Sequence, residues 1–165
     1  MVEIRSYTFL SWQHIGAALT AMVLGILVLC MRKGTLRHRR MGYGYLTCML
    51  AVNASAFCLY KLFGFFGPFH VAAVVSLLTV LAGMRVALRR DRTPGWLVTH
   101  LTYMYWSVIG LYAAFFSEVM VRLPIPGRFM WLVGGATAAT ILFGALMQGR
   151  LTQRWSSEVL VDQPN

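Results

Sequence analysis

Acidic side chains are scarce in this sequence, which has five Asp and Glu residues against 15 Lys and Arg residues and a formal net charge of +10. Most of the basic residues lie in short segments that separate long apolar runs. We attribute their charge to loops that rest against anionic lipid, because anionic membrane surfaces attract Lys and Arg. The charge therefore gives no reason to expect a nucleic-acid partner.

Cysteine is also rare, and the three cysteines, Cys30, Cys48 and Cys58, form neither a CxxC pair nor a disulfide framework. The sequence also lacks a glycine loop that could cradle phosphate and a nucleophile with a base at usable spacing. These absences argue against the familiar classes of soluble enzyme and leave an enzymatic activity undecided. We interpret the cysteines as small buried hydrophobic side chains.

Apolar residues, in contrast, make up 58% of the sequence, and the mean hydropathy is +0.64, as is typical of membrane proteins. A helix of about 20 residues crosses the hydrocarbon core of a bilayer. Five apolar runs are long enough, at residues 8–31, 42–65, 69–88, 96–121 and 128–149. We therefore predict an all-α integral membrane bundle of about five transmembrane helices. Residues 1–150 would form a single domain, and residues 151–165 a polar, flexible cytoplasmic tail.

The distribution of basic residues predicts the orientation of these helices. The first run has no small-residue cleavage site, so we expect it to remain in the mature protein. Four basic residues lie on the side of the N-terminus: Arg5, Lys61, Arg122 and Arg128. The other eleven lie on the opposite side: Arg32, Lys33, Arg37, Arg39, Arg40, Arg85, Arg89, Arg90, Arg92, Arg150 and Arg154. Because Lys and Arg accumulate in cytoplasmic loops, we predict an outside N-terminus and a cytoplasmic C-terminus.

Four histidines, His14, His38, His70 and His100, lie near the ends of different apolar runs. Imidazole is the commonest metal ligand in proteins, and an ionisable group at membrane depth suggests a functional site. His14, in the second turn of the first run, and His70, in the first turn of the third, share the predicted outer level. His100, about one turn into the fourth run, and His38, in the basic loop before the second run, share the inner level.

This pattern repeats, because the first two and the next two predicted helices each form a hairpin with one outer and one inner histidine. Parallel repeats of this kind are known in membrane proteins. If the hairpins pack as a four-helix bundle, the pairs His14/His70 and His38/His100 converge. Paired histidines on facing helices are the axial ligands of haem in two-haem membrane cytochromes. The pattern favours a haem b protein that transfers electrons within or across the membrane, with a quinone or a redox protein as partner. The sequence does not determine the number of subunits.

Two other interpretations remain. Glu118 is the only carboxylate inside a predicted span, and with His14 and His70 it could bind or transport a divalent metal ion. We favour instead an ion pair of Glu118 with Lys61 or Arg122, because it satisfies a costly charge without further assumptions. A non-catalytic membrane scaffold or accessory subunit, with histidines at the interface, is the alternative from a different functional class.

Polar side chains also occur deeper in the second and third runs, at Asn53, Ser55 and Thr79. Interhelical hydrogen bonds explain such residues more simply than a transport path does. We therefore expect these three side chains to join neighbouring helices.

Several short motifs in a fixed order point to a known family. They are Lys33-Gly34-Thr35, His38-Arg39, Gly42, Phe69-His70, His100 with Met104, Gly110-Leu111, Ala113-Ala114 and Pro126-Gly127-Arg128. From His14 to about Arg128 the chain resembles the bacterial predicted-membrane-protein family catalogued as domain of unknown function 2306. The resemblance implies a small multi-helix protein of the bacterial inner (plasma) membrane. The recurring histidine positions of the family correspond to His14, His38, His70 and His100.

Overall fold

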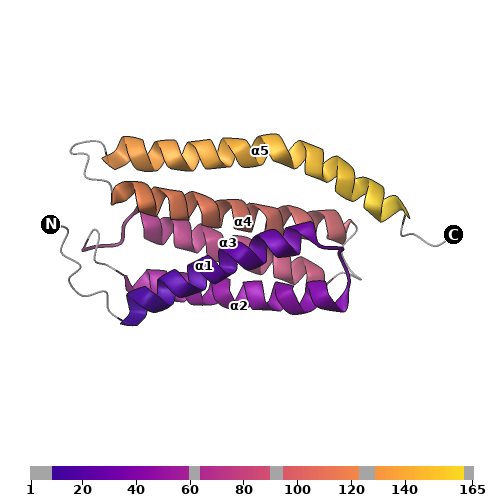
Figure 1. Cartoon of the computed structure of the whole chain (residues 1–165), viewed down its shortest axis with the longest axis horizontal. Helices are drawn as coiled ribbons and strands as arrows, with labels where there is room; N and C mark the ends of the chain where they lie inside the picture. Colours follow the sequence, from indigo (N-terminus) through magenta and orange to yellow (C-terminus); the bar gives the residue numbers. More distant parts are fainter. Residues whose placement is uncertain (1–8, 60–63, 90–94, 123–128, 162–165) are drawn as a thin grey trace. The chain divides into compact units, whose positions relative to one another are not determined.

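The described part of the chain folds into five α-helices. A computed structural model describes residues 9–59, 64–89, 95–122 and 129–161, with side chains over 130–152 in the last range. The helices are α1 (Phe9–Cys30), α2 (Leu36–Cys58), α3 (Pro68–Leu88), α4 (Trp96–Val121) and α5 (Phe129–Val161) (Figure 1). These described ranges contain no strand, so the all-α prediction is confirmed.

Four of the helical segments are long and apolar enough to cross a membrane: Phe9–Cys30, Pro68–Leu88, Trp96–Val121 and Met130–Thr152. The predicted class, a helical membrane protein, is confirmed. Helix α2 is not among these segments, because arginines occupy its first turn and polar residues interrupt its apolar part. Two of those polar residues, Asn53 and Ser55, are only 2% and 7% exposed. Helix α2 therefore turns these two side chains towards protein, whereas its arginines are exposed.

The predicted boundaries hold to within one residue for α1, α3 and α4, and they are wrong for α2 and α5. Helix α2 begins six residues before the predicted 42 because Thr35 caps it, accepting a hydrogen bond from His38 N at 3.1 Å. It ends at Cys58, where the Leu59 N–H donates to Ala56 O instead of continuing the helical ladder. His38, which we predicted in a loop, therefore lies in the first turn of α2.

Helix α5 continues to Val161, twelve residues beyond the predicted end at 149. The apolar run ends at residue 149, but a helix does not need an apolar sequence to continue beyond that point. Residues 162–165 lie outside the described residues, and the predicted division at residue 150 stays a prediction.

The chain divides into two compact units, Met1–Val80 and Leu81–Asn165, and the division falls within α3. In the first unit α1 packs along α2 at an angle (Figure 1). Tyr45 and Met49 of α2 are almost completely buried, as is Ala21 of α1. Asn53 Nδ2 donates to Ser76 Oγ at 3.4 Å and joins α2 to α3. The core of this unit thus combines tight apolar packing with a few interhelical polar contacts.

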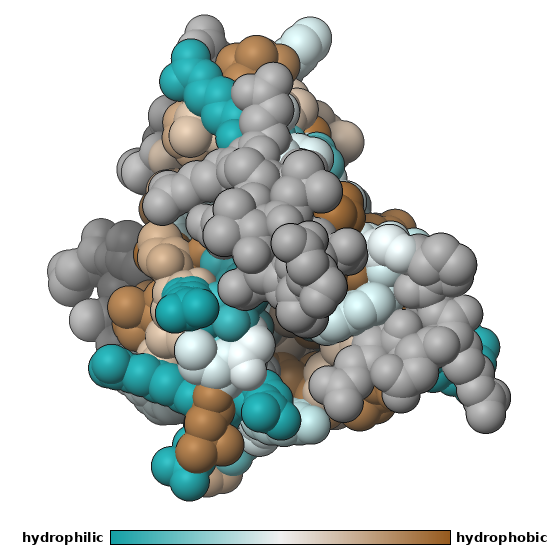
Figure 2. Space-filling view, turned by 90° about the vertical axis from the view of Figure 1, so that its right-hand side faces the viewer, coloured by the Kyte–Doolittle hydropathy of each residue, from teal (hydrophilic) through white to brown (hydrophobic). Residues whose placement is uncertain are grey.

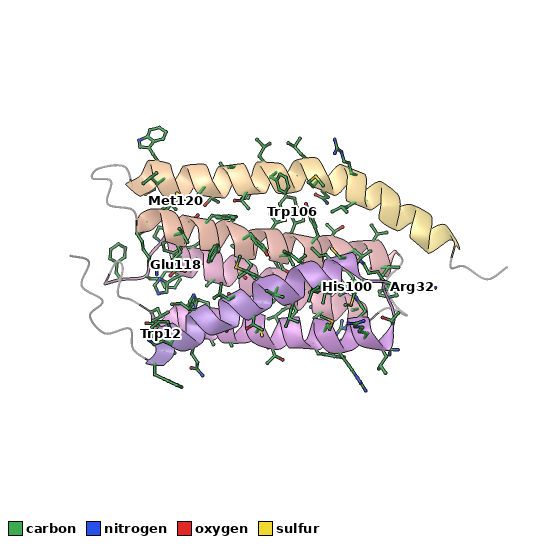
Figure 3. All side chains as sticks on the ribbon, in the orientation of Figure 1. Trp12, Arg32, His100, Trp106, Glu118 and Met120 are labelled. Atoms are coloured by element: carbon green, nitrogen blue, oxygen red, sulfur yellow. The ribbon has the colours of Figure 1, made fainter. Side chains whose placement is uncertain are left out.

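In the second unit α5 lies along α4 (Figure 1). Tyr105 OH donates to Gly144 O at 2.6 Å, and Trp106 Nε1 donates to Gln148 Oε1 at 3.1 Å. Trp106 accordingly points into the space between these two helices (Figure 3). Large apolar side chains on the rest of α5, among them Trp131 and Leu146, are exposed and suited to lipid. Polar contacts inside and apolar groups outside are what a lipid environment selects.

The cysteines do not lie where we predicted. Cys30 and Cys58 are exposed and Cys48 is half-buried, so the expectation of buried side chains is wrong. Cys30 is on α1 and the other two are on α2, but periodicity alone did not indicate which helix face is turned away from the protein.

Candidate histidine sites

His14 lies in the second turn of α1, and its Nδ1 atom is 2.8 Å from Ser55 Oγ in α2. The single hydroxyl hydrogen of Ser55 is directed to backbone oxygens, with Ala51 O at 2.7 Å and Val52 O at 3.0 Å. With that hydrogen on a backbone oxygen, Ser55 Oγ can accept from His14 Nδ1, which then carries the ring hydrogen. In the neutral ring, Nε2 then holds a lone pair that can bind a metal.

His100 reaches the same state through a different partner. Its Nδ1 atom is 2.8 Å from the carbonyl oxygen of Gly83 in the C-terminal part of α3, within the second unit. A carbonyl can only accept, so Nδ1 is the donor and Nε2 again holds a lone pair. Helices α3 and α4 approach closely at Gly83. A Cβ atom built at this position would lie 2.9 Å from Met104 Sδ and 3.0 Å from Tyr103 Cβ, so there is no room for a side chain.

His70 has the opposite arrangement. It is 3% exposed in the first turn of α3, where its Nδ1 accepts a hydrogen bond from Gly67 N at 3.2 Å. The backbone N–H of His70 donates in return to the backbone oxygen of Gly67 at 3.0 Å. The two residues therefore cap the start of α3 reciprocally, similar to a capping box. The ring also packs against Phe66, with centroids 5.0 Å apart. In the neutral ring the hydrogen is therefore on Nε2, and metal binding through that atom would require the ring to leave Gly67.

His38 is half-buried in the first turn of α2, next to exposed arginines. It belongs to the first unit and His100 to the second, so the pair His38/His100 stays a prediction. The hydrogen bonds described for His14 and His70 lead to different partners, Ser55 and Gly67. That pair stays a prediction as well.

Glu118 forms an ion pair within α4. Its Oε1 is 2.7 Å from Arg122 Nη2, and Arg122 Nη1 also donates to Glu118 O at 2.6 Å. Glu118 and His100 lie near opposite ends of α4 (Figure 3). Lys61, the other expected partner, is outside the described residues. Within the described part of the chain, no group of three or more His, Cys, Asp and Glu residues is placed to hold a metal ion.

The predictions for the deeper polar residues are met in part. Asn53 and Ser55 join neighbouring helices as expected, whereas Thr79 donates at 2.7 Å to Val75 O within its own helix. The role of Ser55 as the partner of His14 was not predicted, and neither was that of Gly83. These partners are separated from their histidines by 41 and 17 positions, and only the fold identifies them.

A comparison with protein families finds a match over most of the chain. The model of a family described as predicted membrane protein, DUF2306, matches residues 11–151, which include all four histidines. No curated protein and no solved structure matches the chain.

Proposed function

The chain belongs to the DUF2306 family of predicted membrane proteins, and we propose that it is a b-type haem protein of the bacterial inner membrane that transfers electrons through histidine ligands. One observation carries this proposal. Both His14 and His100 place Nδ1 2.8 Å from an oxygen on a neighbouring helix that can accept its hydrogen, which leaves the Nε2 lone pair for a ligand.

Metal-binding histidines commonly have this arrangement. The ring N–H that does not face the metal is donated to a carbonyl or another fixed acceptor, which sets the tautomer and orients the ring. Histidines within membrane spans are uncommon and often functional. An interhelical hydrogen bond in a membrane contributes only about 0.6 kcal/mol on average, so stability alone is a weak reason to place imidazoles there. Two histidines with the same protonation therefore support a ligand role.

We assign His14 and His100 as the principal ligands, with His70 and His38 as the second ligands of the outer and inner haem. His70 would have to release Gly67 N before its ring could bind iron. When bound, haem would supply an iron centre that cycles between the ferric and ferrous states. The protein would hold it and exclude water, and a quinone or a redox protein would be the electron partner.

The visible absorption spectrum of protein purified from haem-replete cells tests this proposal. We expect a Soret band and, after reduction, sharp bands of b-type character. His14→Ala and His100→Ala should each remove haem. Thr20→Ala is the matched control for His14, because the Thr20 hydroxyl only donates to Gly16 O of its own helix. A colourless protein after haem-supplemented expression would exclude the proposal.

The capping role of His70 favours a second candidate, a membrane scaffold or accessory subunit whose histidines are structural. The variant His70→Gln separates the two functions, because Gln at this position can still cap the helix but cannot replace His as a haem ligand. A haem protein should lose its outer haem while its stability is nearly unchanged. A scaffold should show no haem in either form and a similarly small change in stability.

A further inference from the structure

Five basic residues are concentrated where α1 ends and α2 begins: Arg32, Lys33, Arg37, Arg39 and Arg40. All except the half-buried Lys33 are exposed. The described residues of the first unit, 9–59 and 64–80, contain no Asp or Glu. Arg37, Arg39 and Arg40 therefore have no acidic partner among these described residues.

Lys33 has a structural explanation that does not extend to the arginines of α2. Its Nζ donates to Leu29 O at 2.6 Å and to Met31 O at 2.9 Å, at the end of α1, where the helix dipole favours a cation. Arg37, Arg39 and Arg40 lie instead within the first five residues of α2, at the end where the dipole disfavours cations. They also repel one another. The sequence thus places three like charges at a position that the fold itself does not favour.

If α1 crosses a bilayer, these arginines lie at the depth of the lipid headgroups. Helix α1 is a candidate membrane span that ends at Cys30, so the residues that follow it emerge from the hydrocarbon. Arg32 projects at that end of α1 (Figure 3). In the view onto this end of the molecule, hydrophilic side chains gather in the lower part, over the start of α2 (Figure 2). The anions that a membrane provides at this depth are the phosphate groups of its lipids.

We propose that Arg37, Arg39 and Arg40 form a binding surface for the headgroup of an anionic phospholipid. Arginine suits this role because its planar guanidinium group can bind a phosphate through two hydrogen bonds. Arg37 and Arg40 are three positions apart and share one face of α2, so they can hold the same headgroup. The His38 N–H donates to Thr35 Oγ1 and the Arg39 N–H to Thr35 O, so neither is directed at a headgroup, and we assign the contacts to the arginine side chains.

The basic residues at the end of α3 provide a matched comparison. Arg85 and Arg89 are also exposed, and the predicted topology puts them on the same side of the membrane. They lie in the last turn of α3 and just after it, where the helix dipole stabilises cations. A lipid attracted by net positive charge alone would bind both at the start of α2 and at the end of α3. The proposed surface should be selective for the start of α2.

The test measures lipid retention by the purified full chain in mixed micelles that contain phosphatidylglycerol or phosphatidylcholine. Native mass spectrometry should show preferential retention of phosphatidylglycerol. R37Q/R39Q/R40Q should weaken that retention at least tenfold, whereas R85Q/R89Q should leave it nearly unchanged. Inorganic phosphate at millimolar concentration should not displace the lipid, because a free anion lacks the acyl chains that hold the headgroup at this depth.

A charge-conserving variant covers the case in which the triple glutamine variant does not fold. R37K/R39K/R40K keeps three cations but loses the planar, bidentate geometry, so its retention of phosphatidylglycerol should be intermediate. Equal losses in R37Q/R39Q/R40Q and R85Q/R89Q would overturn the proposal and indicate attraction by net charge alone. Full retention in the triple glutamine variant would also overturn it. The measurement does not depend on whether the protein carries haem.

Discussion

The close approach of α3 and α4 at Gly83 predicts a large effect of a single methyl group. In Gly83→Ala the new Cβ would lie 3.0 Å from Tyr103 Cβ, whereas ordinary contacts are 3.4–4 Å. Met104 Sδ, at 2.9 Å, can move because it is far along a flexible side chain, but Tyr103 Cβ is fixed to the backbone of α4. The two helix segments must therefore separate by a few tenths of an ångström, which also stretches the hydrogen bond from His100 Nδ1 to Gly83 O.

The expected free-energy change follows from three contributions. Overpacking costs about 1–3 kcal/mol, and weakening the interhelical hydrogen bond adds about 0.6 kcal/mol. The better helix propensity of Ala offsets about 0.8–1 kcal/mol. We therefore expect Gly83→Ala to lower the free energy of unfolding by about 0.6–2.8 kcal/mol, measured by equilibrium unfolding in mixed micelles with increasing sodium dodecyl sulfate.

Gly110→Ala is the matched control, because Gly110 is exposed on α4 and a Cβ there would meet nothing within 4 Å. It should leave stability unchanged or raise it by up to about 1 kcal/mol through helix propensity. If the two variants unfold at the same detergent concentration, α3 and α4 are not in contact at Gly83, and the argument for the orientation of His100 fails with it.

Two further predictions concern Glu118 and the topology. Glu118→Gln should change the free energy of unfolding by less than about 0.5 kcal/mol, because a partly exposed ion pair with Arg122 is weak. The metal content of the purified protein should stay at background. A loss of stoichiometric metal in the variant would instead support the metal site with His14 and His70. A reporter fused after Asn165 should be active in the cytoplasm and a tag before Met1 accessible from outside, as the basic residues predict, and a C-terminal reporter active only in the periplasm would reverse this topology.

The helices were predictable where apolarity and helix length coincide. Helices α1, α3 and α4 are bounded by basic, Pro or Gly residues, and their ends follow hydropathy. Helix α2 begins instead at a cap, Thr35, and carries arginines in its first turn, so a search for apolar runs placed it too late. Helix α5 runs on into a polar segment that has no residue to stop it before Pro164.

The chemistry of the histidines was predictable only in part. The spacing of Glu118 and Arg122 identifies a possible ion pair on one helix face, and the structure contains that pair. The tautomers of His14 and His100 depend on Ser55 and on a backbone oxygen of α3, which carry no signal of their own in the sequence. Local periodicity indicates where a histidine lies along a helix, but only packing decides which ring nitrogen is left for a ligand.

The polar interior of α2 has a consequence for how the protein is made. A helix that is not apolar enough to leave the translocon for lipid alone needs a partner that satisfies its polar groups. Ser55 finds His14 of α1 as such a partner, and the five-residue connection from Met31 to Thr35 keeps the two helices together from the start. We therefore expect α1 to remain at the lateral gate of the translocon until α2 has been synthesised. The two helices would then enter the bilayer together as one hairpin.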